Sequence, residues 1–263
     1  MRNVRPALWF DLVLLALFAA VTLALALRTP VLSVDLAVRD LVDAHRPAWA
    51  YWTARGFNYL GQGGQVLTPL AVLTAAFVGW RTHSVRPALP VIGGFVITYL
   101  TIGPLKIWTD RTAASDHKVA HPEYLFHVPT GMSYPSGHVV NAIVWYGVLA
   151  ILLGGLLRPG HLRAIRYGAP AIVLFTTTYL SFHWLTDGLA AICLGLVLDR
   201  VLQRVPWDRV PLPAWFTRRG WSGPIGVDRT GGQALSSRTT IGGSLNSIPS
   251  RAARRRGRSP SAS

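Results

Sequence analysis

The chain has 263 residues, of which 51% are hydrophobic and only 14% are charged, with a net charge of +15. An ordinary soluble domain carries about 25% charged residues, so this composition indicates a membrane protein. Residues 206–263 contribute +8 of the charge, so the basic balance describes mainly the C-terminal part and does not indicate nucleic-acid binding.

The first predicted element is an apolar segment, residues 7–27, interrupted only by Asp11 and Thr22. About 20 such residues cross a bilayer as a helix. A secretory signal peptide is the alternative, because Arg2 and Arg5 precede the segment. The segment is long for a signal peptide and no small-residue cleavage site follows it cleanly, so a retained first span is favoured.

Residues 33–46 place Val34, Val38, Leu41 and His45 at a spacing of three to four. This spacing predicts an amphipathic helix that lies at the membrane surface with these residues on one face. An aromatic-rich segment, residues 49–59, follows and is typical of the membrane interface.

Five further apolar segments predict the second to sixth spans, and they cover residues 65–80, 87–105, 136–157, 167–182 and 184–205. We therefore expect an all-α fold, a six-transmembrane-helix bundle formed by residues 1–205. Residues 206–263 are rich in Pro, Gly, Ser, Thr and Arg and cannot bury enough apolar area to fold, which predicts a disordered basic tail.

Positive charge predicts the orientation of the bundle. With the N-terminus in the cytoplasm, the basic turns 81–86 and 158–166 and the arginine-rich C-terminus all fall on the cytoplasmic side. The segment 29–64, the long polar loop 106–135 and the corner at His183 then share the extracytoplasmic face. A loop of that length in a compact protein is usually functional or disordered.

His183 and Asp187 form the first candidate catalytic pair. They are four residues apart where the last span begins, so on a helix they share a face. A carboxylate that accepts a hydrogen bond from one imidazole nitrogen leaves the other nitrogen free as a nucleophile or base. A buried structural pair is the alternative for these two residues taken alone.

The segment Pro135-Ser136-Gly137-His138 opens another predicted span. Serine before an apolar helix is a good N-cap, and glycine lets the backbone approach a ligand closely. The free N–H groups of a helix start form an anion site, and His138 would be a general acid beside it. A plain cap with an incidental histidine is the simpler alternative.

Lys106 and Arg111 follow the third span. A lysine point charge and an arginine fork suit a phosphoryl group, although cations at helix ends are often merely interfacial. No acidic cluster indicates a metal site. A metal site built from His117, His121 and His127 is a weaker alternative, because their spacing is broken by a proline and is not a clean ligand set.

Together these motifs resemble the type 2 phosphatidic acid phosphatase family, which is related to the vanadium haloperoxidases. The family pattern is a lysine followed by arginine-proline, then Pro-Ser-Gly-His, then Ser-Arg leading to His-x-x-x-Asp. The resemblance covers residues 7–205. The corresponding residues here are Lys106 with Arg111, Pro135-Ser136-Gly137-His138, and Thr176-Thr177 leading to His183 and Asp187.

The resemblance implies a role for each residue. His183 would be the nucleophile that forms a phosphohistidine, Asp187 would orient it, and His138 would donate a proton to the leaving group. The residues implied to hold the phosphate are Lys106, Arg111, Ser136 and Gly137.

Two positions depart from the family pattern. Thr177 replaces the arginine of the third motif, and Ala113-Ala114 replace the arginine-proline pair of the first. The site therefore has fewer fixed positive charges. Losing one charge-assisted contact to a phosphate costs roughly 1.5–3 kcal/mol, which favours an altered activity or a less highly charged phosphate such as a diester.

The leading expectation is a metal-independent integral membrane phosphatase, without a cofactor, that acts on a lipid phosphate or diphosphate at the extracytoplasmic face. A lipid phosphotransferase that moves the headgroup to an alcohol is the first alternative, and the missing arginine slightly favours it. A non-catalytic transporter or scaffold on the same fold is the alternative of another class. A haloperoxidase is disfavoured because those relatives are soluble.

Overall fold

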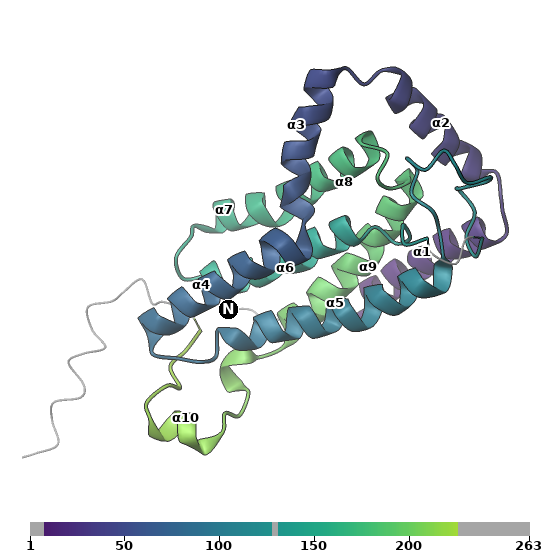
Figure 1. The fold of residues 1–263 in the computed structure, drawn as a ribbon. Helices are drawn as coiled ribbons and strands as arrows, with labels where there is room; N and C mark the ends of the chain where they lie inside the picture. Colours follow the sequence, from purple (N-terminus) through teal and green to yellow (C-terminus); the bar gives the residue numbers. More distant parts are fainter. Residues whose placement is uncertain (1–7, 128–130, 226–263) are drawn as a thin grey trace, which may run out of the picture. The chain divides into compact units, whose positions relative to one another are not determined.

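The computed structural model describes residues 8–127 and 131–225, and within them every regular element is a helix (Figure 1). The predicted all-α class is confirmed for this part of the chain. The α-helices are α1 (Leu8–Ala26), α2 (Val31–Ala44), α3 (Ala48–Asn58), α4 (Thr68–Thr82), α5 (Ala88–Thr109), α6 (Gly137–Leu153), α7 (Pro159–Arg163), α8 (Ala169–Tyr179), α9 (Leu185–Arg204) and α10 (Ala214–Arg218). Short π-helical turns, Gly63–Leu67 and Ala164–Gly168, lead into α4 and α8.

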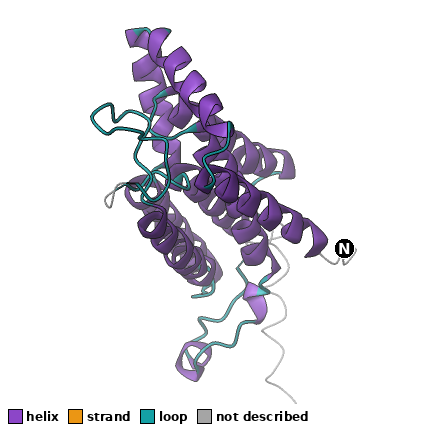
Figure 2. Cartoon of the chain, turned by 90° about the vertical axis from the view of Figure 1, so that its right-hand side faces the viewer, coloured by secondary structure: helices purple, strands orange, loops and turns teal. Residues whose placement is uncertain are grey.

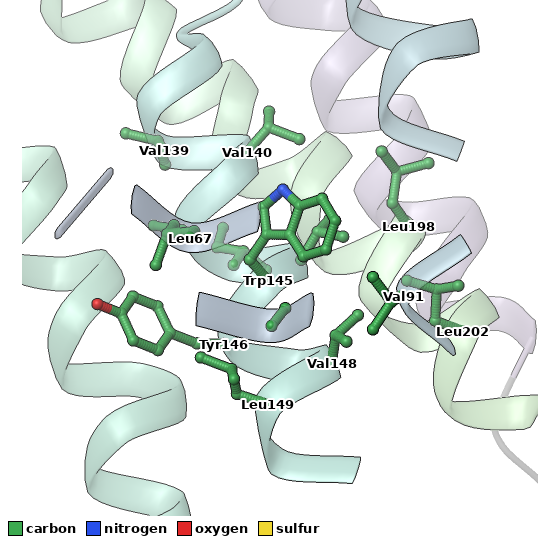
Figure 3. Close-up of a cluster of buried hydrophobic side chains, with 14 of the residues drawn as sticks. Leu67, Val91, Val139, Val140, Trp145, Tyr146, Val148, Leu149, Leu198 and Leu202 are labelled. Atoms are coloured by element: carbon green, nitrogen blue, oxygen red, sulfur yellow. The ribbon is translucent and has the colours of Figure 1, made fainter. Parts of the chain in front are cut away.

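Helix α6 is the centre of the bundle, and it packs against α4, α5, α8 and α9 (Figure 1). Most of its side chains are buried because neighbours surround it, so its sequence is apolar on every side rather than on one stripe. Figure 3 shows this core, in which α6 side chains meet others from several helices. The labelled residues are Leu67, Val91, Val139, Val140, Trp145, Tyr146, Val148, Leu149, Leu198 and Leu202.

Three stretches are long and apolar enough to cross a membrane, Leu8–Ala26, Gly63–Thr82 and Ala88–Thr109. Their outward faces expose large apolar side chains, such as Leu73 at 68% and Tyr99 at 69%. Such surfaces are ordinary against lipid and unusual against water. Of the six predicted spans, these three are supported by length and composition, while the spans at α6, α8 and α9 stay predictions.

Helix α2 forms where the sequence predicts an amphipathic helix, and the face that carries Asp35 is the one turned toward the protein. Val34 and Leu41, placed on the apolar face, are 48% and 60% exposed, whereas Asp35 is 1% exposed. Val34 and Leu41 face outward, whereas Leu32 packs into an apolar cluster with Leu25 and Tyr134. The helix therefore brings carboxylates and arginines toward the ends of α8 and α9.

Helix α3 covers the aromatic-rich segment that the sequence assigned only to the membrane interface. It packs against α8, and Trp49 and Trp52 remain 74% and 68% exposed on its outer side. Both α2 and α3 lie at the end of the bundle where α6 and α9 begin (Figure 1). The long loop between α5 and α6 gathers at that same end, as the turned view in Figure 2 shows.

The described chain continues beyond the predicted domain end at residue 205. Trp207 packs against the core cluster, and its indole N–H donates to the Leu202 carbonyl at 3.0 Å. Asp208 accepts a hydrogen bond from the Ile225 N–H at 2.8 Å, and Ile225 is 4% exposed. A cluster of aromatic and aliphatic side chains thus holds residues 206–225 on the bundle. The predicted disorder of residues 226–263 lies outside the described residues.

Candidate active site

Three sequence motifs that are far apart in the chain meet at one end of the bundle. Lys106 comes from the last turn of α5, Gly137 and His138 open α6, and His183 lies in the turn before α9. A backbone hydrogen bond from the Ser136 N–H to the Asp187 carbonyl, 3.1 Å long, ties the starts of α6 and α9 together. The turn 136–138 and the turn that carries His183 are therefore held in a fixed position relative to each other.

His183 and Asp187 face each other with a serine between them. His183 Nδ1 lies 3.6 Å from Asp187 Oδ2 and 3.2 Å from Ser133 Oγ. The Ser133 hydroxyl donates to Asp187 Oδ2, and the Trp184 N–H donates to the same oxygen at 3.2 Å. This arrangement fixes the imidazole with Nδ1 toward the carboxylate and leaves Nε2 directed away from it.

Burial lowers the pKa of His183 below its ordinary value of 6.5, and the neighbouring Asp187 carboxylate opposes that shift. The lowered pKa keeps the ring neutral near pH 7, because charging it in this environment costs solvation energy. A neutral imidazole has a free lone pair on one nitrogen, which is the form that a nucleophile requires.

His138 lies on the open side of His183. Its Nδ1 is 3.3 Å from His183 Nε2, and the two rings are 5.4 Å apart at an angle of 68°. Its Nε2 is buried and has no hydrogen-bond partner among the described residues. The two imidazole rings are therefore adjacent, and Nε2 of His138 remains available to a bound group.

Lys106 covers the start of α6. A Cβ added to Gly137 would lie 3.2 Å from Lys106 Cε and 3.7 Å from Nζ, so a larger residue there would displace the end of the lysine by a few tenths of an ångström. The Lys106 ammonium donates to the Met132 carbonyl. Ser136 caps α6 by accepting from the Val139 N–H at 3.5 Å. The first N–H groups of a helix have no partner within it, so a positive side chain and free amides converge here.

Arg111 lies behind the histidines, fully buried. Its Nη2 is 2.6 Å from Asp35 Oδ2, and its Nη1 is 2.5 Å from Asp187 Oδ1 and 2.8 Å from Thr186 Oγ1. Two carboxylates therefore offset its charge. It orients the carboxylate of Asp187 in this structure, and the phosphate contact predicted for it stays a prediction.

Thr177 lies in the last turns of α8 and is completely buried. Its hydroxyl donates to the Val173 carbonyl at 2.8 Å, one turn back along the same helix. It therefore presents no charge and no free donor to the histidines. The cation that the family pattern has at this position is missing from the site.

Three contact residues were not predicted, namely Asp35, Ser133 and Thr186. Ser133 lies two residues before the Pro-Ser-Gly-His segment, and Thr186 lies beside Asp187, so proximity to a motif was a usable signal. Asp35 is 76 residues from Arg111, and only its place on the polar face of a predicted helix pointed to it.

The loop histidines take part in packing the loop. His121 stacks on Tyr124 at 4.7 Å and lies 3.3 Å from Glu123, and His127 contacts the Ala120 carbonyl at 2.8 Å. His117 is 66% exposed and lies 3.9 Å from Asp43. Over the part of the chain that the structure describes, no group of three or more His, Cys, Asp or Glu is placed to hold a metal ion.

Two comparisons with known proteins find phosphatases that are similar to this chain. Phosphatidylglycerophosphatase B of Bacillus subtilis (strain 168) is 27% identical over 182 residues, which cover 67% of this chain and 85% of that protein. A crystal structure of a transmembrane PAP2-type phosphatidylglycerolphosphate phosphatase from Bacillus subtilis matches with a TM-score of 0.62 and 25% identity, covering 74% of this chain and 94% of that one.

The family model of the PAP2 superfamily matches residues 87–211, which contain all the sequence motifs described above. The resemblance recognised in the motifs is confirmed, and with the membrane-spanning helices it supports a membrane lipid phosphatase. Over these residues, the chain is similar to the PAP2 superfamily.

Proposed function

We propose that this protein hydrolyses a lipid phosphomonoester at the extracytoplasmic face of the membrane, through a phosphohistidine on His183. The observation that carries the proposal is the position of the His183 ring. One nitrogen faces Asp187 and Ser133, and the other faces His138 beside the Ser136–Gly137 turn. This is the arrangement that a buried imidazole needs to attack phosphorus.

In the first step, His183 Nε2 forms a bond to phosphorus while the bond from phosphorus to the lipid oxygen breaks. His138, carrying a proton, gives it to that oxygen, so the lipid leaves as an alcohol. His183 becomes positively charged at this moment. The carboxylate of Asp187, fully buried and close to Nδ1, stabilises that charge.

In the second step, water replaces the histidine. His138 accepts a proton from the water while oxygen bonds to phosphorus and the bond from phosphorus to Nε2 breaks. Inorganic phosphate leaves and His183 returns to its neutral form. If an alcohol entered instead of water, the same step would transfer the phosphoryl group, so hydrolysis and transfer must be measured separately.

The phosphoryl oxygens are held by Lys106, by the amides of Gly137 and His138, and by Ser136. Phosphoryl transfer depends mainly on positioning and charge stabilisation, which these groups supply without a metal ion. Arg111 supports the site by holding Asp187. The proposed activity is accordingly independent of metal ions and of any cofactor.

The proposed substrate is a phosphatidylglycerol phosphate or a similar lipid phosphomonoester. The names of the similar Bacillus subtilis protein and of the similar Bacillus subtilis crystal structure support this choice. The predicted basic turns support an active site at the extracytoplasmic face, because these turns would lie on the opposite, cytoplasmic side.

The test uses the full chain purified in detergent. Phosphatidylglycerol phosphate, phosphatidic acid, a polyprenyl diphosphate and a phosphodiester lipid are compared for released phosphate and for transferred headgroup. His183→Ala should abolish turnover, and the surface variant His161→Ala is the matched control. Rapid quenching with a 32P-labelled substrate should trap an acid-labile label on the wild type and none on His183→Ala. Undiminished turnover by His183→Ala would refute the mechanism.

A further inference from the structure

We propose that Arg39 of α2 is a phosphate-binding residue of this site and supplies the second cation that the phosphoryl group requires. The proposal rests on the proposed function, because it names a further residue for the same reaction. It comes from the placement of α2, which the sequence predicted only as a helix at the membrane surface.

Helix α2 lies along the turn that carries His183. Asp35 accepts hydrogen bonds from the Thr186 N–H at 3.0 Å and from its hydroxyl at 2.6 Å. Two turns further along, Asp43 accepts from the Ser181 hydroxyl at 2.7 Å. Arg39 is one turn from each aspartate on the same face of the helix. It therefore lies level with residues 183–184, between those two contacts.

The Arg39 side chain is only 17% exposed and points at this turn. Its Cζ lies 5.5 Å from the centre of the Trp184 ring, which guides the guanidinium by a cation–π contact. Arg39 and His183 line the same narrow crevice, which is closed in this structure. A charged fork and the candidate nucleophile thus face one small space.

The charge balance of the site calls for another cation. A phosphomonoester carries about −1.5 to −2 charges at pH 7. Lys106 supplies one positive charge, while the charge of Arg111 is offset by the buried carboxylates Asp35 and Asp187. Arg39 has an adjacent carboxylate partner, Asp40, at 2.8 Å, but Asp40 is 66% exposed. A surface pair of this kind is weak, so a phosphate can compete for the guanidinium.

The crevice also has small lining residues and a further hydrogen-bond donor. Ala114 and Thr178 line it beside Arg39, and both are small. The Thr178 hydroxyl is buried and has no hydrogen-bond partner among the described residues. These two residues directly follow Ala113 and Thr177, the positions at which this chain lacks arginines of the family pattern. Arg39 of another helix thus lies beside the sequence neighbours of the two positions that lack these charges.

The experiment compares Arg39→Gln, Arg39→Lys, Asp40→Asn and the exposed control Arg81→Ala in the full chain. Two quantities are measured, the KM for a lipid phosphomonoester and the Kd for orthovanadate or inorganic phosphate by thermal shift. Arg39→Gln keeps the stem over Trp184 and should raise both by about tenfold, since one charge-assisted contact is lost. Arg39→Lys should recover part of the affinity because it keeps the charge without the fork.

Asp40→Asn separates phosphate binding from a structural role. It frees Arg39 from its surface partner, so phosphate affinity should be unchanged or higher. An equal loss of phosphate affinity in Asp40→Asn and Arg39→Gln would show that only the ion pair between Arg39 and Asp40 matters. That result would overturn the proposal. Unchanged phosphate affinity in Arg39→Gln would overturn it as well.

A measurement on the wild type does not depend on folding of a variant. Phosphate should slow modification of Arg39 by phenylglyoxal, read by mass spectrometry, and should not slow that of Arg81. Lack of protection at Arg39 counts against the proposal. If the wild type hydrolyses none of the lipids but phosphate still protects Arg39, the proposed function fails while the binding residue stands.

Discussion

Asp35 and Arg111 form an ion pair in which neither side chain is exposed, with Nη2 of the arginine 2.6 Å from Oδ2 of the aspartate. They lie 76 residues apart, and the pair joins α2 to the loop that follows α5. Arg111 also holds the carboxylate of Asp187, so α2 is connected through two ion pairs to the carboxylate beside the candidate nucleophile. The amphipathic helix is thus a structural part of the site.

Asp35→Ala should therefore destabilise the protein and impair turnover together. Removing one partner of a buried pair costs about 3 kcal/mol or more, because the arginine keeps its buried charge with less compensation. A fall in Tm of roughly 5–10 °C follows for a chain of this size. The measurement is thermal unfolding in detergent alongside kcat. Asp40→Asn, at an exposed position of the same helix, should leave Tm unchanged, and an equal loss of Tm there would contradict this explanation.

Ser133→Ala tests how the pair of His183 and Asp187 is aligned. The Ser133 hydroxyl donates to Asp187 and lies 3.2 Å from His183 Nδ1, so it bridges a pair that is 3.6 Å apart. Its loss should lower kcat about tenfold, the value of one hydrogen bond to a charged group, with little change in KM. Ser33→Ala, at an exposed position, is the matched control. A change confined to KM would mean that Ser133 contacts the substrate instead.

The motifs were predictable from the sequence because each is local. Pro-Ser-Gly-His before an apolar run reports a helix start, and the spacing of His183 and Asp187 reports their proximity. Asp35 was not predicted, because its importance depends on a contact with a distant residue. The face that α2 turns toward the protein was not predicted either. In a membrane protein the apolar face of a surface helix can turn outward, which leaves the polar face for the protein.

Composition alone also could not predict where the folded part of the chain ends. Prolines and charged residues interrupt the apolar side chains of residues 206–225, yet Trp207 and Ile225 pack on the bundle. Ser84 and Arg86 secure this segment by donating to the carbonyls of Gly223 and Val210, at 2.6 Å and 2.7 Å. Average hydrophobicity does not report a few well-placed anchors, so the boundary at residue 205 could not be refined from the sequence.

The pH dependence of turnover should show the lowered pKa of His183. Burial favours the neutral ring, so the free base persists to lower pH than in an exposed histidine. The acid limb of kcat/KM should therefore have its midpoint below 6.5. A titration of the substrate followed by 31P NMR separates its own ionisation from that of the enzyme. A midpoint clearly above 6.5 would show that the nucleophile is not held in the neutral form.

Treatment with a chelator should leave the activity intact. Lys106 and the amides at the start of α6 supply the positive charge that a metal ion would otherwise provide. The measurement is the initial rate after dialysis against EDTA, with and without added Mg²⁺. A loss that Mg²⁺ or Zn²⁺ restores would favour a metal-dependent reaction, and His121→Ala with His127→Ala would then test the loop histidines.

An ion cluster at the far end of α9 should affect stability alone. Asp11 of α1 pairs with Arg200 and Arg204, which lie 13 or more residues beyond Asp187 along α9, or about 20 Å at 1.5 Å per residue. Asp11→Ala leaves two arginines without this carboxylate between α1 and α9, so Tm should fall. Because the cluster is remote from His183, kcat at a temperature where the variant is folded should equal that of the wild type. A large fall in kcat at that temperature would show that α1 packing reaches the active site.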